Sequence, residues 1–265
     1  MPYKLYIGTN TKMYKTAADT VAYLKELSRL TSDISRNEME LFVIPSYTSL
    51  HHANAAIQNA EIKLGAQNMA WEDEGQFTGE ISPLMLSEIG IDIVMIGHSE
   101  RRHVFGESDH EENLKVRCAL RHGFTALLCI GETQQQKDDG VSDEALRMQI
   151  KRGLKDVDAD KLNRMWIAYE PVWAIGVSGK PASAEYADEK HGVIKDCLLE
   201  LYGAAASDVP VLYGGSVNNQ NATELIGMAN IDGLFIGRSA WQADNFNYII
   251  RQALPLFRAK RSSAK

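Results

Sequence analysis

The sequence AYEPVWAIG, residues 168–176, joins an apolar run to a carboxylate and then to a proline. Glu170 ends the run, Pro171 follows it directly, and Gly176 and Gly179 lie a few residues further on. A strand that ends on a carboxylate and continues into such a loop suggests a general base beneath a movable lid. The rest of the chain is then expected to supply an electrophile, an anchor for the substrate and a means of excluding water.

Short apolar runs recur along the chain at fairly regular intervals, and each one is a candidate strand. They are residues 4–8, 41–44, 62–66, 93–96, 125–130, 166–169, 209–213 and 234–236. Stretches with helical spacing lie between them, among them residues 16–30, 112–122 and 183–201, the last with Ser183 as its expected N-cap. This alternation predicts a parallel sheet with helices outside it, and eight repeats predict a closed (β/α)8 barrel.

An open doubly wound sheet is the structural alternative. Such a sheet usually carries a glycine-rich phosphate turn after its first strand, and Gly8-Thr9-Asn10-Thr11-Lys12 lacks that turn. No low-complexity linker divides the 265 residues, so we predict a single barrel domain over residues 1–257. Residues 258–265 are basic and poor in apolar side chains, and we expect this tail to be disordered.

The composition bears on which partners the protein binds and on the cell compartment in which it works. The formal net charge is −7, which argues against a nucleic-acid or membrane-surface binder. The three cysteines show no pairing pattern, which fits a reducing cytoplasm, and Cys129 within an apolar run is expected to be a core residue. The N-terminus has no apolar signal run, and no segment approaches the roughly 20 apolar residues of a membrane span.

The residues that follow the strands of a barrel build its active site. Here these positions are occupied by Asn10, Lys12, Gln67, Asn68, His98, Glu132, Glu170 and the turns Gly214-Gly215-Ser216 and Gly237-Arg238-Ser239. Taken singly, a lysine is usually a solvated surface residue, a histidine a surface or capping residue, and a glycine a turn. Together they offer a base, a cation, a neutral imidazole beside an expected helix start, and backbone N–H groups that can bind a phosphate.

Longer motifs around these residues resemble the triosephosphate isomerase family along nearly the whole chain. The motifs are NTKM (10–13), GAQN (65–68) with FTGEIS (77–82), IGHSERR (96–102) with FGE (105–107), CIGE (129–132), the stretch around Glu170, and YGGSV (213–217). The resemblance implies a single TIM barrel of the α/β class. It also implies an isomerase that moves a carbonyl between adjacent carbons of a sugar phosphate through an enediolate, without a metal or an organic cofactor.

The resemblance also implies a role for each catalytic residue. Glu170 would be the base, and His98 the neutral electrophile that polarises the carbonyl. Lys12 would stabilise the enediolate and the phosphate, Asn10 would orient the substrate oxygen, and Glu100 would support Lys12 or the surroundings of His98.

Phosphate binding and assembly follow from the same resemblance. Backbone N–H groups would hold the phosphate at Gly176, Ser216, Gly237 and Arg238, with Gly214 and Gly215 in the same turns. Residues 171–183 would close as a lid. The loop around Phe77-Thr78-Gly79 would insert into a second subunit, so a homodimer is implied.

Four departures from the family pattern bear on the substrate. Thr11 replaces a tryptophan, Tyr14 replaces an asparagine, the lid GVSGK (176–180) is one residue longer, and the last phosphate turn reads GRSAW (237–241). With IDGLFIGRSAW (231–241) and ISPLML (81–86), they resemble the branch that acts on the four-carbon L-erythrulose 1-phosphate. That branch makes D-erythrulose 4-phosphate in tetritol catabolism.

Two alternatives remain at this point. One is a triosephosphate isomerase with a divergent lid, which would interconvert dihydroxyacetone phosphate and D-glyceraldehyde 3-phosphate. The other is a phosphate-binding barrel without catalysis, against which the intact Asn10, Lys12, His98 and Glu170 argue.

Overall fold

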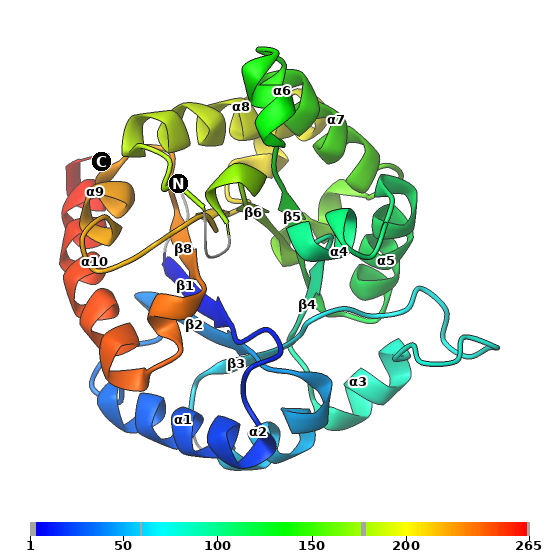
Figure 1. The fold of residues 1–265 in the computed structure, drawn as a ribbon, viewed down its shortest axis with the longest axis vertical. Helices are drawn as coiled ribbons and strands as arrows, with labels where there is room; N and C mark the ends of the chain where they lie inside the picture. The colour runs from blue at the N-terminus through cyan, green and yellow to red at the C-terminus, as the bar shows by residue number, and fades with distance from the viewer. Residues whose placement is uncertain (1–3, 59, 176–178, 264–265) are drawn as a thin grey trace.

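A closed barrel of parallel strands forms the centre of the molecule (Figure 1). The computed structural model describes residues 4–58, 60–175 and 179–263. The strands are β1 (Leu5–Asn10), β2 (Met39–Ile44), β3 (Lys63–Ala66), β4 (Ile93–Ile96), β5 (Thr125–Ile130), β6 (Met165–Tyr169), β7 (Val211–Tyr213) and β8 (Gly233–Ile236). Each pairs with the next along the chain, and β8 closes on β1. The predicted (β/α)8 barrel is therefore confirmed, and the open sheet is excluded.

Helices surround the barrel on all sides (Figure 1). They are α1 (Ala17–Leu30), α2 (Leu50–Ala56), α3 (Pro83–Ile89), α4 (Ser99–His103), α5 (Asp109–Arg121), α6 (Gln134–Asp138), α7 (Ser142–Gly153), α8 (Ala184–Tyr202), α9 (Ala222–Gly227) and α10 (Ala243–Ser263). Ser183 caps α8 as expected, accepting from the N–H of Tyr186. Helix α5 begins three residues before the predicted 112, because Ser108 and Glu111 form a capping box there. None of the described helices is both long and apolar enough to cross a membrane.

The core has two layers, as alternation along the strands requires. One set of strand side chains fills the barrel interior: Phe42, Ile44, Ile93, Met95, Leu127, Cys129, Trp166, Ala168, Leu212 and Phe235. The other set packs outward against the helices. Cys129 is fully buried in the interior layer, in keeping with its predicted place in the core. The packed interior gives the loops at the barrel mouth a rigid base.

The basic tail differs from the prediction. Helix α10 continues to Ser263, so residues 258–263 are helical and not disordered. Arg258 pairs with Glu38 at 2.6 Å, and Lys260 donates to the backbone carbonyls of Met228 and Ile231. These partners lie far away in the sequence, so composition alone could not reveal that the basic side chains are anchored.

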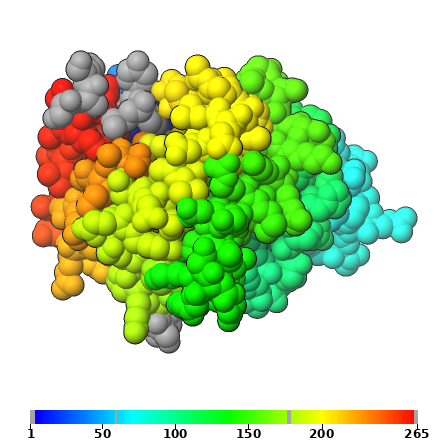
Figure 2. Space-filling model, turned by 90° about the horizontal axis from the view of Figure 1, so that it is seen from above, coloured from blue at the N-terminus to red at the C-terminus, as the bar shows by residue number. Residues whose placement is uncertain are grey.

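The loop between β3 and α3 extends away from the barrel (Figure 1). In Figure 2 the cyan segment that contains it protrudes from one side of an otherwise rounded surface. Phe77, in the part of this loop expected to reach a second subunit, is 41% exposed.

Candidate active site

Glu170 and His98 face each other at the C-terminal ends of β6 and β4. Glu170 Oε1 lies 3.6 Å from His98 Nε2, and both side chains are buried. The other carboxylate oxygen accepts from the backbone N–H of Ser99 at 3.4 Å. The backbone N–H of Glu100 donates to His98 Nδ1 at 3.2 Å, so a neutral imidazole carries its proton on Nε2. The Glu170 carboxylate, an acceptor, and the His98 Nε2–H, a donor, therefore point toward the same place.

Two glycines allow Glu170 to lie where it does. A Cβ on Gly131 would lie 1.9 Å from the Glu170 carbonyl oxygen, and a Cβ on Gly214 would lie 2.8 Å from Glu170 Cγ. The Glu170 N–H donates to the carbonyl of Ile130 at 2.7 Å, which continues the β5–β6 ladder by one residue. Pro171 then ends the strand, because it has no N–H to donate. The residues after both neighbouring strands therefore hold Glu170, Gly131 against its backbone and Gly214 against its side chain.

Lys12 is held at the mouth by a strained backbone. Its φ is +51°, in the left-handed region that costs a non-glycine residue about 1–3 kcal/mol. Its N–H donates to Asn10 Oδ1 at 2.8 Å, while Gln67 Nε2 donates to both Asn10 Oδ1 (3.1 Å) and the Lys12 carbonyl (2.8 Å). Gln67 thus pins the conformation, a role that its place after a strand did not reveal.

Glu100 connects the cation to the imidazole. Its Oε1 accepts from Lys12 Nζ at 2.6 Å, and its Oε2 lies 3.6 Å from His98 Nδ1. The sequence left open whether Glu100 supports Lys12 or the surroundings of His98, and in the structure it contacts both. Asn10, Lys12, His98, Glu100 and Glu170 therefore form one continuous group.

The glycine turns follow β7 and β8, which are neighbours in the barrel. Ser216 is held by Asn221, whose Nδ2 donates to its carbonyl at 2.8 Å. A Cβ on Gly237 would meet open space, and Arg238 is exposed, with no side-chain partner in the described part of the chain. Gly214 touches Glu170, but no hydrogen bond among the described residues joins Gly215, Ser216, Gly237 or the Arg238 side chain to Lys12 or His98. Gly176 lies outside the described residues.

Glu132, which the sequence placed only at a strand end, is the centre of a buried cluster. Its Oε1 accepts from Tyr169 Oη (3.0 Å), Trp173 Nε1 (2.9 Å) and Tyr186 Oη (2.9 Å). Burial, together with this carboxylate, raises the pKa of Tyr169 well above its ordinary value. Lys137 Nζ lies 3.4 Å from the centre of the Trp173 ring, a cation–π contact. The start of the expected lid is thus tied to α6 and α8, and no local sequence signal links these residues.

Two of the departures from the family pattern, Tyr14 and the GRSAW turn, meet in space. Trp241 Nε1 donates to the carbonyl of Asn10 at 2.9 Å, and the Tyr14 ring lies 4.5 Å from the Trp241 ring, centre to centre. Thr11, which follows Asn10 in the chain, is fully buried, and its hydroxyl has no hydrogen-bond partner among the described residues. We call Thr11, Tyr14, Arg238 and Trp241 the β8–β1 seam. The sequence marked these residues separately and did not connect them.

The arrangement is suited to proton transfer on a small anionic substrate. It provides a buried carboxylate, an imidazole N–H, a lysine and two glycine-containing turns, of which the second has open space at Gly237. In the described ranges, one group of three side chains could hold a metal ion, and it lies outside this site: Asp73, Cys118 and His122.

Known proteins are similar to this chain in fold and in sequence. The triosephosphate isomerase family model matches residues 5–253. The L-erythrulose-1-phosphate isomerase of Rhizobium etli is 47% identical over 244 residues, which is 91% of this chain and 90% of that protein. The protein of the same name from Mesorhizobium japonicum is 46% identical over 94% of this chain and 96% of its own length.

Triosephosphate isomerases are also similar to this chain. That of Trichlorobacter lovleyi is 41% identical over 92% of this chain and 97% of its own length. The solved structure of triosephosphate isomerase from Bartonella henselae superposes with a TM-score of 0.85 at 32% identity, covering 96% of this chain and 99% of that one. The chain therefore belongs to the triosephosphate isomerase family, and it is a sugar-phosphate isomerase.

Proposed function

We propose that this enzyme converts L-erythrulose 1-phosphate to D-erythrulose 4-phosphate in tetritol catabolism. The observation that carries the choice of substrate is the likeness to proteins named L-erythrulose-1-phosphate isomerase, at 44–47% identity over more than nine tenths of this chain. A triosephosphate isomerase matches over a similar length at 41%. The buried pair of Glu170 and His98 supports catalysis over simple phosphate binding.

In the proposed reaction, Glu170 removes the proton from C3 of the substrate while His98 Nε2–H donates to the carbonyl oxygen on C2. The electron pair of the C3–H bond forms the C2–C3 double bond of the enediolate. His98 then takes the proton of the C3 hydroxyl, and Glu170 returns its proton to C2, leaving the carbonyl on C3. Triosephosphate isomerase itself is the established example of this division of roles between a glutamate and a neutral histidine.

Lys12 and Asn10 complete the proposed reaction centre. Lys12 Nζ would offset the negative charge of the enediolate, and the Asn10 amide would orient the substrate oxygen. The strained backbone of Lys12, held by Gln67 through Asn10, keeps the ammonium group beside Glu100. Because protons are only moved within the substrate, the reaction needs no metal or organic cofactor.

The phosphate would bind at the turns after β7 and β8. Backbone N–H groups of Ser216, Gly237, Arg238 and the lid residue Gly176 are the proposed donors, with Gly214 and Gly215 keeping the first turn narrow. Arg238 supports this proposal because its guanidinium is exposed at the mouth and has no ion-pair partner among the described residues. A free cation there adds to the attraction for a dianion.

The β8–β1 seam supports a substrate longer than a triose phosphate. L-erythrulose 1-phosphate is dihydroxyacetone phosphate with a hydroxymethyl group added to the reacting carbon. Thr11 is smaller than the tryptophan usual in the family, and Trp241 instead supplies an indole that contacts Asn10. We propose that the seam and the lengthened lid admit the added group. A contact of this size discriminates by about 1–3 kcal/mol, so residual activity on triose phosphates is expected.

We also propose a cytoplasmic homodimer. Exposed apolar side chains lie on the segments that follow β1, β3 and α4: Met13, Tyr14, Phe77, Val104 and Phe105. In a dimer these side chains would be covered by the second copy, since contiguous exposed apolar surface marks an interface. The loop around Phe77-Thr78-Gly79 protrudes from the body (Figure 2), and we propose that it reaches the Asn10 and Lys12 loop of a second copy.

One assay tests the substrate. The ratio kcat/KM should be measured for L-erythrulose 1-phosphate and for D-glyceraldehyde 3-phosphate, on the same preparation, with its mass in solution determined. We expect the tetrulose phosphate to be preferred. Preference for the triose phosphate would replace the proposal with triosephosphate isomerase. Activity on neither, from a folded dimer, would favour the non-catalytic phosphate-binding barrel.

A further inference from the structure

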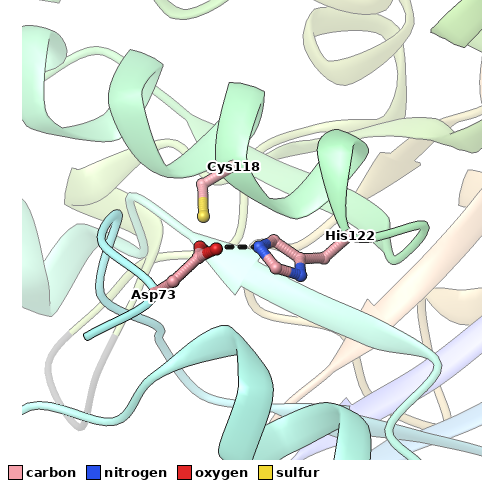
Figure 3. Close-up of side chains that lie close together, drawn as sticks. All are labelled: Asp73, Cys118 and His122. Carbon is pink, nitrogen blue, oxygen red and sulfur yellow. Dashed lines mark hydrogen bonds and ion pairs between the residues drawn. The ribbon is translucent and has the colours of Figure 1, made fainter.

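We propose that Asp73, Cys118 and His122 form a binding site for a single Zn²⁺ ion, separate from the catalytic group. Cys118 and His122 are four residues apart on α5 and at its C-cap, so both project from one face of the helix. Asp73 comes from the loop that follows β3. Figure 3 shows the thiol and the imidazole pointing toward the Asp73 carboxylate.

The donor atoms lie close enough together to contact one metal ion. Asp73 Oδ1 is 2.8 Å from His122 Nε2, and the ligand atoms of all three residues lie within 4.8 Å of one another. Around a tetrahedral zinc ion, ligand atoms of these types are separated by about 3.3–3.6 Å. Side-chain movements of about an ångström would therefore suffice. The Asp73 side chain is 48% exposed, which leaves water access to a fourth coordination position.

The same position already attracts a cation. Arg121 Nη2 donates to Asp73 Oδ1 at 2.9 Å and to Cys118 Sγ at 3.4 Å. One cationic nitrogen therefore contacts two of the three proposed ligands. The Arg121 side chain is 57% exposed, so it can turn into solvent when a metal ion takes its place. Exposed ion pairs of this kind contribute little, so the competition from Arg121 is weak.

The surroundings hold the ligands in place. Ser82 Oγ donates to the Asp73 carbonyl at 2.6 Å, which fixes the loop backbone at the start of α3. The His122 ring lies 6.4 Å from the Phe124 ring at 27°. Cys118 is only 1% exposed. A metal ion would therefore bind a group whose backbones are already positioned by other contacts.

The combination of thiol, imidazole and carboxylate suits Zn²⁺ among the common ions. Binding would convert the Cys118 thiol to a zinc thiolate and release its proton to solvent, with no change of oxidation state. Burial raises the pKa of this thiol to about 11, so the metal must displace the proton. The bound ion would link the protruding loop to α5.

Cobalt titration of the full-length, chelator-treated protein tests the site, because Co²⁺ replaces Zn²⁺ and reports a thiolate ligand by charge-transfer absorption. We expect one Co²⁺ per chain with this absorption, and its loss when Zn²⁺ is added. Cys118→Ser should abolish the absorption, and His122→Asn should weaken binding at least about tenfold. His110→Asn, an exposed histidine on the same helix, is the matched control and should bind as the wild type does.

Arg121→Ala provides a readout that a folding defect cannot imitate. Removing the competing guanidinium should tighten Co²⁺ binding by about two- to fivefold. Binding without thiolate absorption would overturn the proposal. So would unchanged affinity in both Arg121→Ala and His122→Asn, because the three residues would then form only an ion-pair cluster.

Discussion

The two halves of the barrel mouth differ in how far they follow the family. The half on β4, β6 and β7 carries His98, Glu170 and Gly214, and the motifs there match the family closely. Its groups are buried and interlocked with neighbouring backbone. The β8–β1 seam carries departures from the family pattern, and two of its side chains are exposed: Tyr14, at 69%, and Arg238.

This difference separates chemistry from substrate choice. An added side-chain atom next to Glu170 meets Glu170 itself, its backbone in the case of Gly131 and its side chain in the case of Gly214. In the seam, Tyr14 and Arg238 are exposed, so substitutions there can change the contacts offered to the substrate while the proton-transfer geometry stays in place. Variants of the first half should therefore slow both substrates equally, and variants of the seam should alter the preference between them.

The largest effect is expected for Glu170→Gln. The amide keeps the size of the side chain and cannot accept the C3 proton, so kcat should fall by about 10³-fold or more on either substrate. The ratio between the two substrates should stay unchanged. Inhibition by inorganic phosphate, measured in parallel, should be nearly unaltered. Near-normal kcat would mean that Glu170 is not the base.

Gly214→Ala tests the packing beneath the base. The added methyl would lie 2.8 Å from Glu170 Cγ and push the carboxylate out of position. A misplacement of about 1 Å can cost about 10²-fold in kcat, again equally for both substrates. Gly227→Ala, where a Cβ meets open space, is the control and should leave kcat unchanged. Equal kcat for the two variants would contradict this account of Gly214.

His191 makes the catalytic half sensitive to acid. It is fully buried, its ring lies against Tyr169 and Tyr213, and burial lowers its pKa to about 3. The unfolded chain would bind a proton near pH 6.5, so this contribution to stability is present above that pH and is lost as the pH falls toward 3.

Replacing His191 by leucine should therefore flatten the pH dependence of stability. Between pH 7 and pH 5 the wild type should lose on the order of 2 kcal/mol more free energy of unfolding than His191→Leu. Urea unfolding at the two pH values measures the difference, and any constant packing cost cancels. His110→Leu, at an exposed position, should keep the wild-type slope. Parallel slopes for the wild type and His191→Leu would show that His191 titrates normally.

The smallest effect is expected in the seam. Trp241→Phe removes the indole N–H that bonds the Asn10 carbonyl and keeps an aromatic ring beside Tyr14. We expect the preference for tetrulose phosphate over triose phosphate to fall about tenfold, with kcat for the triose nearly unchanged. Tyr248→Phe, on the exposed side of α10, serves as the control. Equal losses on both substrates would mean that the seam supports catalysis and not selectivity.

The sequence predicted the catalytic residues better than the contacts that hold them in place. Glu170, His98 and Lys12 stand directly after strands, where a barrel gathers its functional groups, so their meeting could be expected from order alone. The Glu132 cluster could not, since its three donors come from β6, the segment after it, and α8. The prediction of a disordered tail was wrong for the same reason, because Arg258 and Lys260 find partners on distant loops.

The periodicity of the chain and the residues at its strand ends determined the barrel and the candidate base, because these depend on local pattern and strand order. The isomerase class followed from the longer motifs that resemble the family. Only the tertiary structure decided which nitrogen of His98 faces Glu170, how Gln67 holds the strained Lys12, and that the scattered departures form one seam. Trp241 and Asn10 are 231 residues apart in the chain, and they touch only because β8 closes on β1. Contacts between residues that only barrel closure brings together cannot be predicted from local sequence patterns.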